Sequence, residues 1–274
     1  KVRERIMKIG IVTDEISLKV DEALGYCNKW GINLVEIRCL ETGRVPYIND
    51  DELKRFIELK NNYGITVTAL SPGFFKGKLS EKEKYREEID KHFPNLVKLC
   101  EKLDTKMIII FGFNRDKNEP ESNLDMVVNI FGEFASKAEK YDLKIAVENE
   151  PGFWCDTGSN TAEIIRKVNM KNFGSNWDPA NAFYKDAKET PYPDGYNKIK
   201  EFIFNVHVKD TKLGSLVECC PVGEGLIDWE GQIKALIEDK IVNHVTIETH
   251  CLPLIEKSKI DIDRITEIIK KYSV

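Results

Sequence analysis

The sequence alternates short apolar runs with segments of helical periodicity, and this alternation limits the fold more than any other feature. Between the runs, apolar residues recur at helical spacing, for example over 20–30, 50–63 and 124–141, and two of these segments end at Gly31 and Gly64. Each repeat is about 26 to 41 residues long, which suits one strand, one helix and two short loops. Eight apolar or alternating runs begin near residues 7, 33, 66, 106, 144, 173, 203 and 244.

Eight strand–helix repeats without a long linker predict a closed (β/α)8 TIM barrel, an α/β fold that forms a single domain over residues 1–274. The alternative is an open doubly wound sheet, which would need a glycine-rich phosphate-binding turn after an early strand. The sequence has no such turn. The sixth helix, within 192–202, is expected to be short, and the segment 212–229 is long enough to lie over a site.

Composition narrows the class of partner. Of the 274 residues 32% are charged, and the formal net charge is only -5. Neither a nucleic-acid surface nor a disordered acidic tail is indicated, so a small soluble molecule is the expected partner. Seven cysteines, an odd number without a CxxC pair, indicate a reducing, cytoplasmic location. No run approaches the roughly 18 apolar residues of a membrane span, so no membrane association is expected.

Four polar residues stand at the ends of the last four predicted strands. They are Glu148 in "AVENE", Asp178 in "NWDP", His207 in "NVHVK" and Glu248 in "TIETH". The carboxyl ends of barrel strands meet on one rim, where the loops to the following helices build the site. Any one of the four could be a solvated residue at a strand end. Four of them on consecutive strands favour a functional site.

Three carboxylates on one rim need a neutralising partner. Two carboxylates about 4 Å apart repel by roughly 4 kcal/mol at an effective dielectric of 20, and three such pairs rival the roughly 5–15 kcal/mol that stabilise a whole domain. Protons or a divalent cation could neutralise them, and the imidazole favours a cation because histidine is the commonest metal ligand. Three oxygen donors and one nitrogen suit Mn²⁺, Mg²⁺ or Co²⁺ better than a thiolate zinc site would.

A second set of polar residues is expected around these four, because residues two apart on a strand face the same way. These residues could orient the four or offer hydrogen bonds and charge to a polyol or a phosphate. For Glu36 and Arg38 the alternative is an ion pair with each other. Four aromatic residues expected near the same face could line a pocket. The polar set is Glu36, Arg38, Lys76, Glu150, Asn176, Lys209 and His250, and the aromatic set is Phe74, Phe153, Trp154 and Trp177.

Together these motifs resemble the xylose isomerase-like TIM barrels, in the branch of the sugar phosphate isomerases and epimerases. The resemblance extends along nearly the whole chain, through "IGIVTDEIS", "GINLVEIR", "LSPGFFK", "AVENEPG", "WDPANAF", "HVKD", "PVGEGLIDW" and "IETH". It implies one divalent metal ion, Mn²⁺ before Mg²⁺, Co²⁺ or Zn²⁺, bound by Glu148, Asp178, His207 and Glu248. It also implies that Glu148 and Glu248 act as acid and base, which gives epimerisation or aldose–ketose isomerisation through an enediolate.

The chain departs from the ketose 3-epimerase pattern of that family at two positions. Asn181 stands where those enzymes carry a histidine, three residues after the aspartate, and it is expected to contact the substrate. Leu213 stands where they carry an arginine, six residues after the histidine, with Lys209 and Lys212 nearby. These departures argue against a 3-epimerase of free ketoses, and the substrate is expected to be a sugar or sugar derivative, phosphorylated or not.

Other functions within the same fold are an inosose-type dehydratase, which expels a β-hydroxyl from the same kind of enolate, and a sugar-binding barrel without turnover. The DNA-repair branch of the family uses more histidines than the four in this chain, and the sequence has no basic stripe. Because many barrels of this kind pair, a homodimer is an expectation that follows from the resemblance alone.

Overall fold

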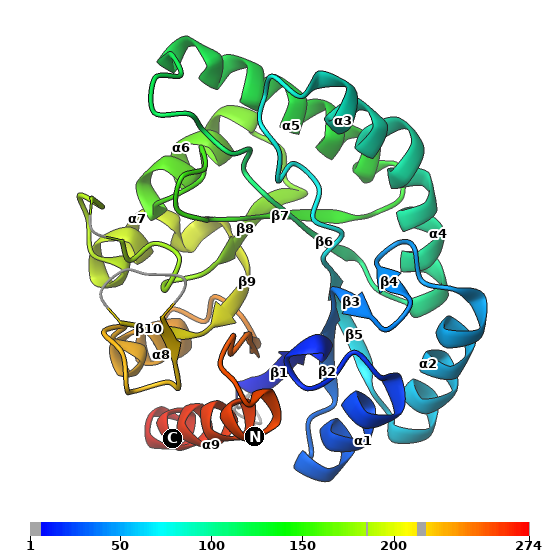
Figure 1. Ribbon diagram of the computed structural model, residues 1–274. Coiled ribbons are helices and arrows are strands. Elements are labelled where there is room, and N and C mark those ends of the chain that lie inside the picture. Colours follow the sequence, from blue (N-terminus) through cyan, green and yellow to red (C-terminus); the bar gives the residue numbers. More distant parts are fainter. Residues whose placement is uncertain (1–6, 185, 213–217, 274) are drawn as a thin grey trace, which may run out of the picture.

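The centre of the molecule is a closed barrel of parallel strands (Figure 1). The computed structural model describes residues 7–184, 186–212 and 218–273. Neighbours around the barrel run β1-β12-β9-β8-β7-β6-β5-β2, and β2 pairs with β1 to close it. These strands coincide with the eight predicted runs, so the predicted (β/α)8 fold is confirmed. The strands are β1 (Lys8–Val12), β2 (Leu34–Ile37), β5 (Thr66–Leu70), β6 (Met107–Ile110), β7 (Lys144–Glu148), β8 (Phe173–Trp177), β9 (Ile203–Val208) and β12 (His244–Ile247).

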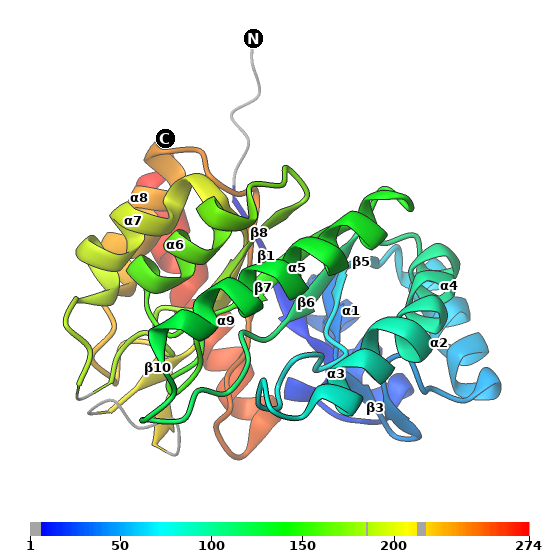
Figure 2. The same ribbon diagram turned by 90° about the horizontal axis from the view of Figure 1, so that it is seen from above.

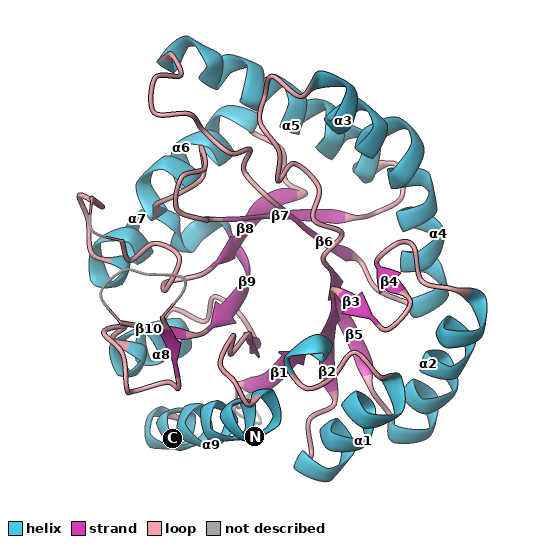
Figure 3. Ribbon diagram, viewed as in Figure 1, coloured by secondary structure: helices cyan, strands magenta, loops and turns pink. Residues whose placement is uncertain are grey.

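Helices form a layer around the outside of the barrel. The two views at right angles (Figures 1 and 2) and the colouring by secondary structure (Figure 3) show this layer. As predicted, Gly31 and Gly64 end the first two helices in the left-handed conformation that glycine adopts without strain. The helix of the sixth repeat, α7, is also short, as predicted. The helices are α1 (Val20–Trp30), α2 (Asp50–Tyr63), α3 (Lys82–Glu87), α4 (Phe93–Leu103), α5 (Leu124–Glu139), α6 (Gly158–Val168), α7 (Tyr196–Ile199), α8 (Trp229–Glu238) and α9 (Leu254–Tyr272).

Two small hairpins extend the loops at the carboxyl end of the barrel. One pairs β3 (Cys39–Leu40) with β4 (Gly43–Arg44) after β2, and the other pairs β10 (Asp210–Thr211) with β11 (Cys219–Cys220) after β9. Part of the predicted loop 212–229, residues 213–217 with Leu213, lies outside the described residues.

Beyond β11, this loop is held to the end of β9 by one carboxylate. Asp210 accepts hydrogen bonds from the backbone N–H groups of Gly223, Gly225 and Ile227, at 2.8, 3.3 and 3.1 Å. The second half of the loop is therefore a fixed structure beside the barrel rim.

A half-polar layer of side chains fills the barrel just below the rim. Its members stand two residues before the four predicted site residues and so face the same interior. Asn205 donates to the side-chain oxygen of Asn176 at 3.0 Å and accepts from the Thr246 hydroxyl at 3.3 Å. The four residues of the layer are Ala146, Asn176, Asn205 and Thr246, all buried.

The four aromatic residues expected near the rim are buried. The indole N–H of Trp177 donates to Gln232 on α8 at 3.0 Å, and the Arg115 guanidinium lies 3.9 Å above the ring of Trp154. Trp154 and Trp177 therefore pack loops and helices against the barrel. In the part of the chain that the structure describes, no helix combines the length and the apolar composition that crossing a membrane requires.

Candidate metal centre

The four residues at the strand ends converge in the structure as the sequence predicts. Glu148, Asp178, His207 and Glu248 come from the neighbouring strands β7, β8, β9 and β12, and all four are buried. Each offers one donor atom, and these atoms all lie within 4.8 Å of one another. His207 Nδ1 lies 3.3 Å from Glu248 Oε2 and 3.6 Å from Glu148 Oε1. Donor atoms around one metal ion at about 2.0–2.2 Å must have separations of this size.

His207 is oriented by Glu36. The imidazole Nε2 lies 2.9 Å from Glu36 Oε2, while Nδ1 is buried and has no hydrogen-bond partner among the described residues. A proton on Nε2 that is donated to Glu36 leaves the lone pair of Nδ1 directed at Glu148 and Glu248. This arrangement, with a carboxylate behind the histidine, is the usual support of a metal-binding imidazole. The donor set therefore fits a divalent cation.

Burial and charge oppose each other at His207. Burial lowers the pKa of the imidazole, but the surrounding carboxylates of Glu36, Glu248 and Glu148 outweigh burial and raise that pKa well above its usual value. The pocket thus attracts positive charge, which either a proton on the imidazole or a metal ion beside it would supply.

Glu36 lies inside the barrel and makes no ion pair with Arg38, so the alternative ion pair between them is wrong. Besides contacting His207, its carboxylate accepts a hydrogen bond from the Ser71 hydroxyl at 2.5 Å and faces the Asn205 amide at 3.5 Å. The strand alternation does place Glu36 and Arg38 at the same parity, but Arg38 is directed to the rim and Glu36 to the interior.

Lys209 is a buried cation within the cluster. Its Nζ lies 2.8 Å from Asp178 Oδ2 and donates to Glu248 Oε2 at 2.9 Å. Burial lowers the pKa of this ammonium group, but the two carboxylates outweigh burial and raise the pKa well above its usual value. At Glu248, burial raises the pKa of the carboxyl group. Lys209 and His207 lower that pKa by more than burial raises it, so the pKa falls well below the usual range.

Two asparagine side chains hold the acidic residues of β7 and β8 together. Asn149 accepts from the backbone N–H of Asp178 at 2.9 Å and donates to its carbonyl oxygen at 2.8 Å. Asn181 donates to Glu148 Oε1 at 3.2 Å, and its own N–H bonds to Asp178 Oδ1 at 3.0 Å. Asn181 thus lies within the cluster, and its predicted contact with the substrate stays a prediction. Asn149 was not predicted. It stands between Glu148 and Glu150 and has the opposite strand parity to both, and only its complete burial distinguishes it.

Arg38 is bound by three carboxylates at the edge of the cluster. Its Nε donates to Asp14 at 2.8 Å, and its two terminal nitrogens donate to Glu15 at 2.7 Å and to Glu248 Oε1 at 2.6 Å. His250 Nε2 lies 3.2 Å from both Glu15 and Glu248. Asp14 and Glu15 were not predicted, although "TDE" directly follows the first strand and so reaches the same rim.

Glu150 and Lys76 lie farther out and face each other across 3.6 Å. Burial raises the pKa of Glu150 to about 7. Lys76 is half-exposed, and its ammonium group lies 4.3 Å from the centre of the Phe111 ring. These two predicted substrate contacts therefore form an outer pair, whereas Glu36, Lys209 and Asn181 touch the four converging residues directly.

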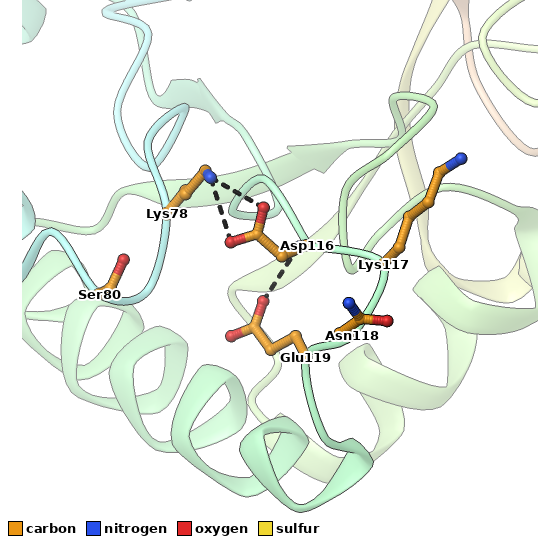
Figure 4. Close-up of a pocket in the computed structure, with 6 residues that line it drawn as sticks. All are labelled: Lys78, Ser80, Asp116, Lys117, Asn118 and Glu119. Carbon is orange, nitrogen blue, oxygen red and sulfur yellow. Dashed lines mark hydrogen bonds and ion pairs between the residues drawn. The ribbon is translucent and has the colours of Figure 1, made fainter.

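A separate polar recess of about 640 Å³ lies on the loops after β5 and β6 (Figure 4). Lys78 and Asp116 cross it as an ion pair at 2.8 Å, and both side chains are exposed. An exposed pair of this kind contributes little free energy. None of the four converging residues lines this recess, whose walls are Lys78, Ser80, Asp116, Lys117, Asn118 and Glu119.

Comparison with known proteins agrees with this architecture. Residues 24–268 match the xylose isomerase-like TIM barrel family. The uncharacterized protein MJ1311 of Methanocaldococcus jannaschii is 24% identical over 232 residues, which are 82% of this chain and 76% of that protein. The crystal structure of the IolI protein with a bound zinc atom is 23% identical, has a TM-score of 0.80, and covers 97% of this chain and 99% of that one.

A second solved structure, of a D-tagatose 3-epimerase-like protein, is 20% identical with a TM-score of 0.79. The match covers 98% of this chain and 100% of that one. At these identities the two structures establish the likeness of the fold, and the chemistry has to be argued from the residues of this chain.

Proposed function

The chain belongs to the xylose isomerase-like TIM barrel family, and we propose that it is a divalent-metal-dependent isomerase or epimerase of a sugar or sugar derivative. One observation carries the proposal. Three buried carboxylates surround an imidazole whose Nδ1 lacks a hydrogen-bond partner among the described residues and whose Nε2 faces Glu36 at 2.9 Å. Lys209 and Arg38 already compensate part of the charge of these carboxylates, and a cation beside Nδ1 would compensate the rest, which is costly to bury uncompensated.

Glu148, Asp178, His207 and Glu248 would hold the metal ion. When bound, the ion would polarise two adjacent oxygens of the substrate and acidify the C–H between them. The oxygen-rich donor set is compatible with Mn²⁺, Mg²⁺ or Co²⁺, and the zinc bound to the similarly folded IolI protein keeps Zn²⁺ among the candidates.

Glu148 and Glu248 would exchange the proton with the substrate carbon. Their surroundings differ: an amide group of Asn181 holds Glu148, whereas two cations, Arg38 and Lys209, hold Glu248. Hydrogen bonds from cations stabilise the ionised form and lower the basicity of a carboxylate. We therefore assign removal of the proton to Glu148 and return of a proton to Glu248, on the other side of the substrate.

The outer residues would position the rest of the substrate. Lys76, Glu150 and His250 are at the open edge of the cluster and offer both hydrogen-bond donors and acceptors to hydroxyl groups. A carbohydrate presents many such groups, so this lining supports a polyol as the substrate class.

Two measurements test the proposal. The first is the metal content of the purified protein beside Asp178→Asn, which should lose the metal and keep its circular dichroism spectrum. The second is proton exchange with D₂O, followed by NMR over a panel of free and phosphorylated sugars and inososes.

Deuterium incorporation without loss of water would support isomerisation or epimerisation, and Glu148→Gln should abolish it. A product lighter by one water would identify a dehydratase instead. Tight sugar binding without any exchange would indicate a binding protein. A protein that takes up no metal from Mn²⁺, Co²⁺ or Zn²⁺ solutions would overturn the metal centre altogether.

A further inference from the structure

Arg38 stands at the edge of the cluster and forms ion pairs with three carboxylates. Each of its three guanidinium nitrogens faces a different one: Asp14 at 2.8 Å, Glu15 at 2.7 Å and Glu248 at 2.6 Å. A guanidinium group has five N–H donors in a rigid plane, and here that plane joins the ends of β1, β2 and β12. Three of these donors are engaged by carboxylates and Nη1 also lies 3.2 Å from His250 Nε2, so binding a substrate anion is not its main task.

The far side of the guanidinium group is itself held in place. Asp14 accepts from the backbone N–H of Cys39 at 3.3 Å, and Glu15 accepts from the backbone N–H of His250 at 2.8 Å. The carbonyl oxygen of Glu15 also accepts from the Ser258 hydroxyl on α9 at 2.9 Å. Asp14 and Glu15 therefore fix Arg38 from the side opposite to Glu248.

This arrangement determines how Glu248 is oriented. Oε1 is taken by Arg38, so the carboxylate is turned with Oε2 toward Lys209 at 2.9 Å and toward His207 Nδ1 at 3.3 Å. Oε2 is thereby the oxygen that faces the other members of the cluster. Among the described residues, no lysine or arginine makes an ion pair with Glu148, which is held by the Asn181 amide.

We propose that Arg38, held by Asp14 and Glu15, is a positioning residue that fixes Glu248 with Oε2 directed at the metal. This inference rests on the proposed function, because it concerns a ligand of the proposed metal centre. Arginine suits the role because its planar fork can face three carboxylates at once, whereas a lysine ammonium group is a point charge on a flexible stem. Partners that orient metal ligands typically change metal affinity about 10- to 100-fold when they are removed.

The test measures Mn²⁺ binding to the whole protein, with free Mn²⁺ followed by electron paramagnetic resonance. Arg38→Met should weaken binding about 10- to 100-fold, and Arg38→Lys should weaken it less. Arg115→Met is the matched control, since Arg115 is another partly buried arginine on a rim loop that pairs with a carboxylate, Glu121. Its affinity should equal that of the wild type.

A double-mutant cycle separates positioning from a general structural effect. In Glu248→Gln, which lacks the group that Arg38 orients, adding Arg38→Met should leave the Mn²⁺ affinity unchanged. An equal further loss in that background would overturn the inference, as would wild-type affinity in Arg38→Met. If Arg38→Met does not fold, Arg38→Lys and Asp14→Asn carry the same cycle.

Mn²⁺ binding distinguishes a failure of the proposed function from a failure of the role of Arg38. A wild-type protein that binds no Mn²⁺, Co²⁺ or Zn²⁺ would overturn the proposed function, and the inference about Arg38 with it. A wild-type protein that binds Mn²⁺ with the same affinity as Arg38→Met would overturn only the role of Arg38.

Discussion

Lys209 shows how much of the cluster depends on a single side chain. It is 4% exposed and contacts the carboxylates of Asp178 and Glu248, which are themselves buried. Removing one member of a buried ion pair leaves an uncompensated charge in a medium of low dielectric. The stability of the metal-free protein should therefore depend strongly on this residue.

We expect Lys209→Met to lower the free energy of unfolding by about 3–5 kcal/mol, measured by urea denaturation in the presence of a chelator. Mn²⁺ should recover part of this loss, because it neutralises the same carboxylates. Lys78→Met is the control, since Lys78 pairs with Asp116 at an exposed position and should show no measurable change. Equal stability of Lys209→Met and wild type would show that the two acids are protonated or solvated.

Asn149 has a backbone role at the same site. Its amide group bonds to both the N–H and the carbonyl oxygen of Asp178. Asn149→Ala leaves the buried N–H of Asp178 without a partner, which costs about 1–3 kcal/mol, whereas the carbonyl oxygen of Asp178 still accepts from the N–H of Ala182 at 3.2 Å. We expect a correspondingly lower melting temperature, by calorimetry, whereas Asn118→Ala in the open recess should melt with the wild type. A melting temperature unchanged in Asn149→Ala would mean that water replaces the amide.

Some of these residues could be predicted from the sequence and others could not. Asp178 and His207 could be found because strand ends on one rim are fixed by the barrel topology. The partner of Arg38 could not be predicted, because Arg38 and Glu248 are 210 residues apart in the chain. Strand parity alone allows several acidic residues to be that partner. Asp14 and Glu15 were missed because they lie in a 3-10 turn, Thr13–Glu15, where the two-residue alternation of a strand no longer holds.

At the scale of elements, the π-helical turn Glu88–His92 between α3 and α4 carries a buried acid. Glu88 accepts a hydrogen bond from the backbone N–H of Phe75 at 2.8 Å. Burial raises the pKa of this carboxyl group to about 7, and its charged neighbours are Lys84, which lowers the pKa, and Glu81, which raises it. The turn thus links the loop after β5 to a group that titrates near neutrality.

This link predicts a pH-dependent stability. The folded pKa of Glu88 is about 7 and its ordinary value is 4.5, so the folded state holds the proton more tightly. Its contribution to stability is complete below about pH 4.5 and is lost as the pH rises through about 7. Compared with Glu88→Gln, the wild type should lose on the order of 2 kcal/mol of unfolding free energy between pH 5 and 8. Parallel curves from urea denaturation across that range would contradict this.

The loop after β11 depends on Asp210 in a similar way. A side chain at Gly225 would lie within 2.1 Å of Asp210 Oδ1, and no rotation of the new methyl group relieves that contact. We expect Gly225→Ala and Asp210→Ala to free residues 221–227 and to speed their cleavage by chymotrypsin at the exposed Leu226. Gly132→Ala, which meets no neighbour on α5, is the control. Equal cleavage rates in all three variants would show that other contacts hold the loop.

At the scale of the whole molecule, the barrel was predicted because eight repeats leave few other topologies. Local pattern does not determine the irregular steps in the sheet, such as the register shift between Val35 and Glu36 where β2 pairs with β5. That shift precedes Glu36, which strand parity places in the polar set around the four site residues. Parity does not decide between a contact of Glu36 with the four residues and an ion pair with Arg38, and the structure shows the contact with His207.

A metal ion that binds only the folded barrel should stabilise the entire molecule. At a free concentration of 100 times the dissociation constant, the gain is about 2.7 kcal/mol. The melting temperature should therefore rise with Mn²⁺ concentration for the wild type and stay constant for Asp178→Asn. A shift of equal size in both proteins would locate the bound ion elsewhere.

Barrel closure also has a consequence for how the protein is made. The last strand, β12, pairs with the first, with Lys8 opposite His244, and Glu248 follows that strand. A ribosome adds about 5–20 residues per second, so a nascent chain carries Glu148, Asp178 and His207 for some seconds before β12 and Glu248 emerge. The cluster can assemble only after β12 has emerged, and its completion reports that the newly made barrel has closed.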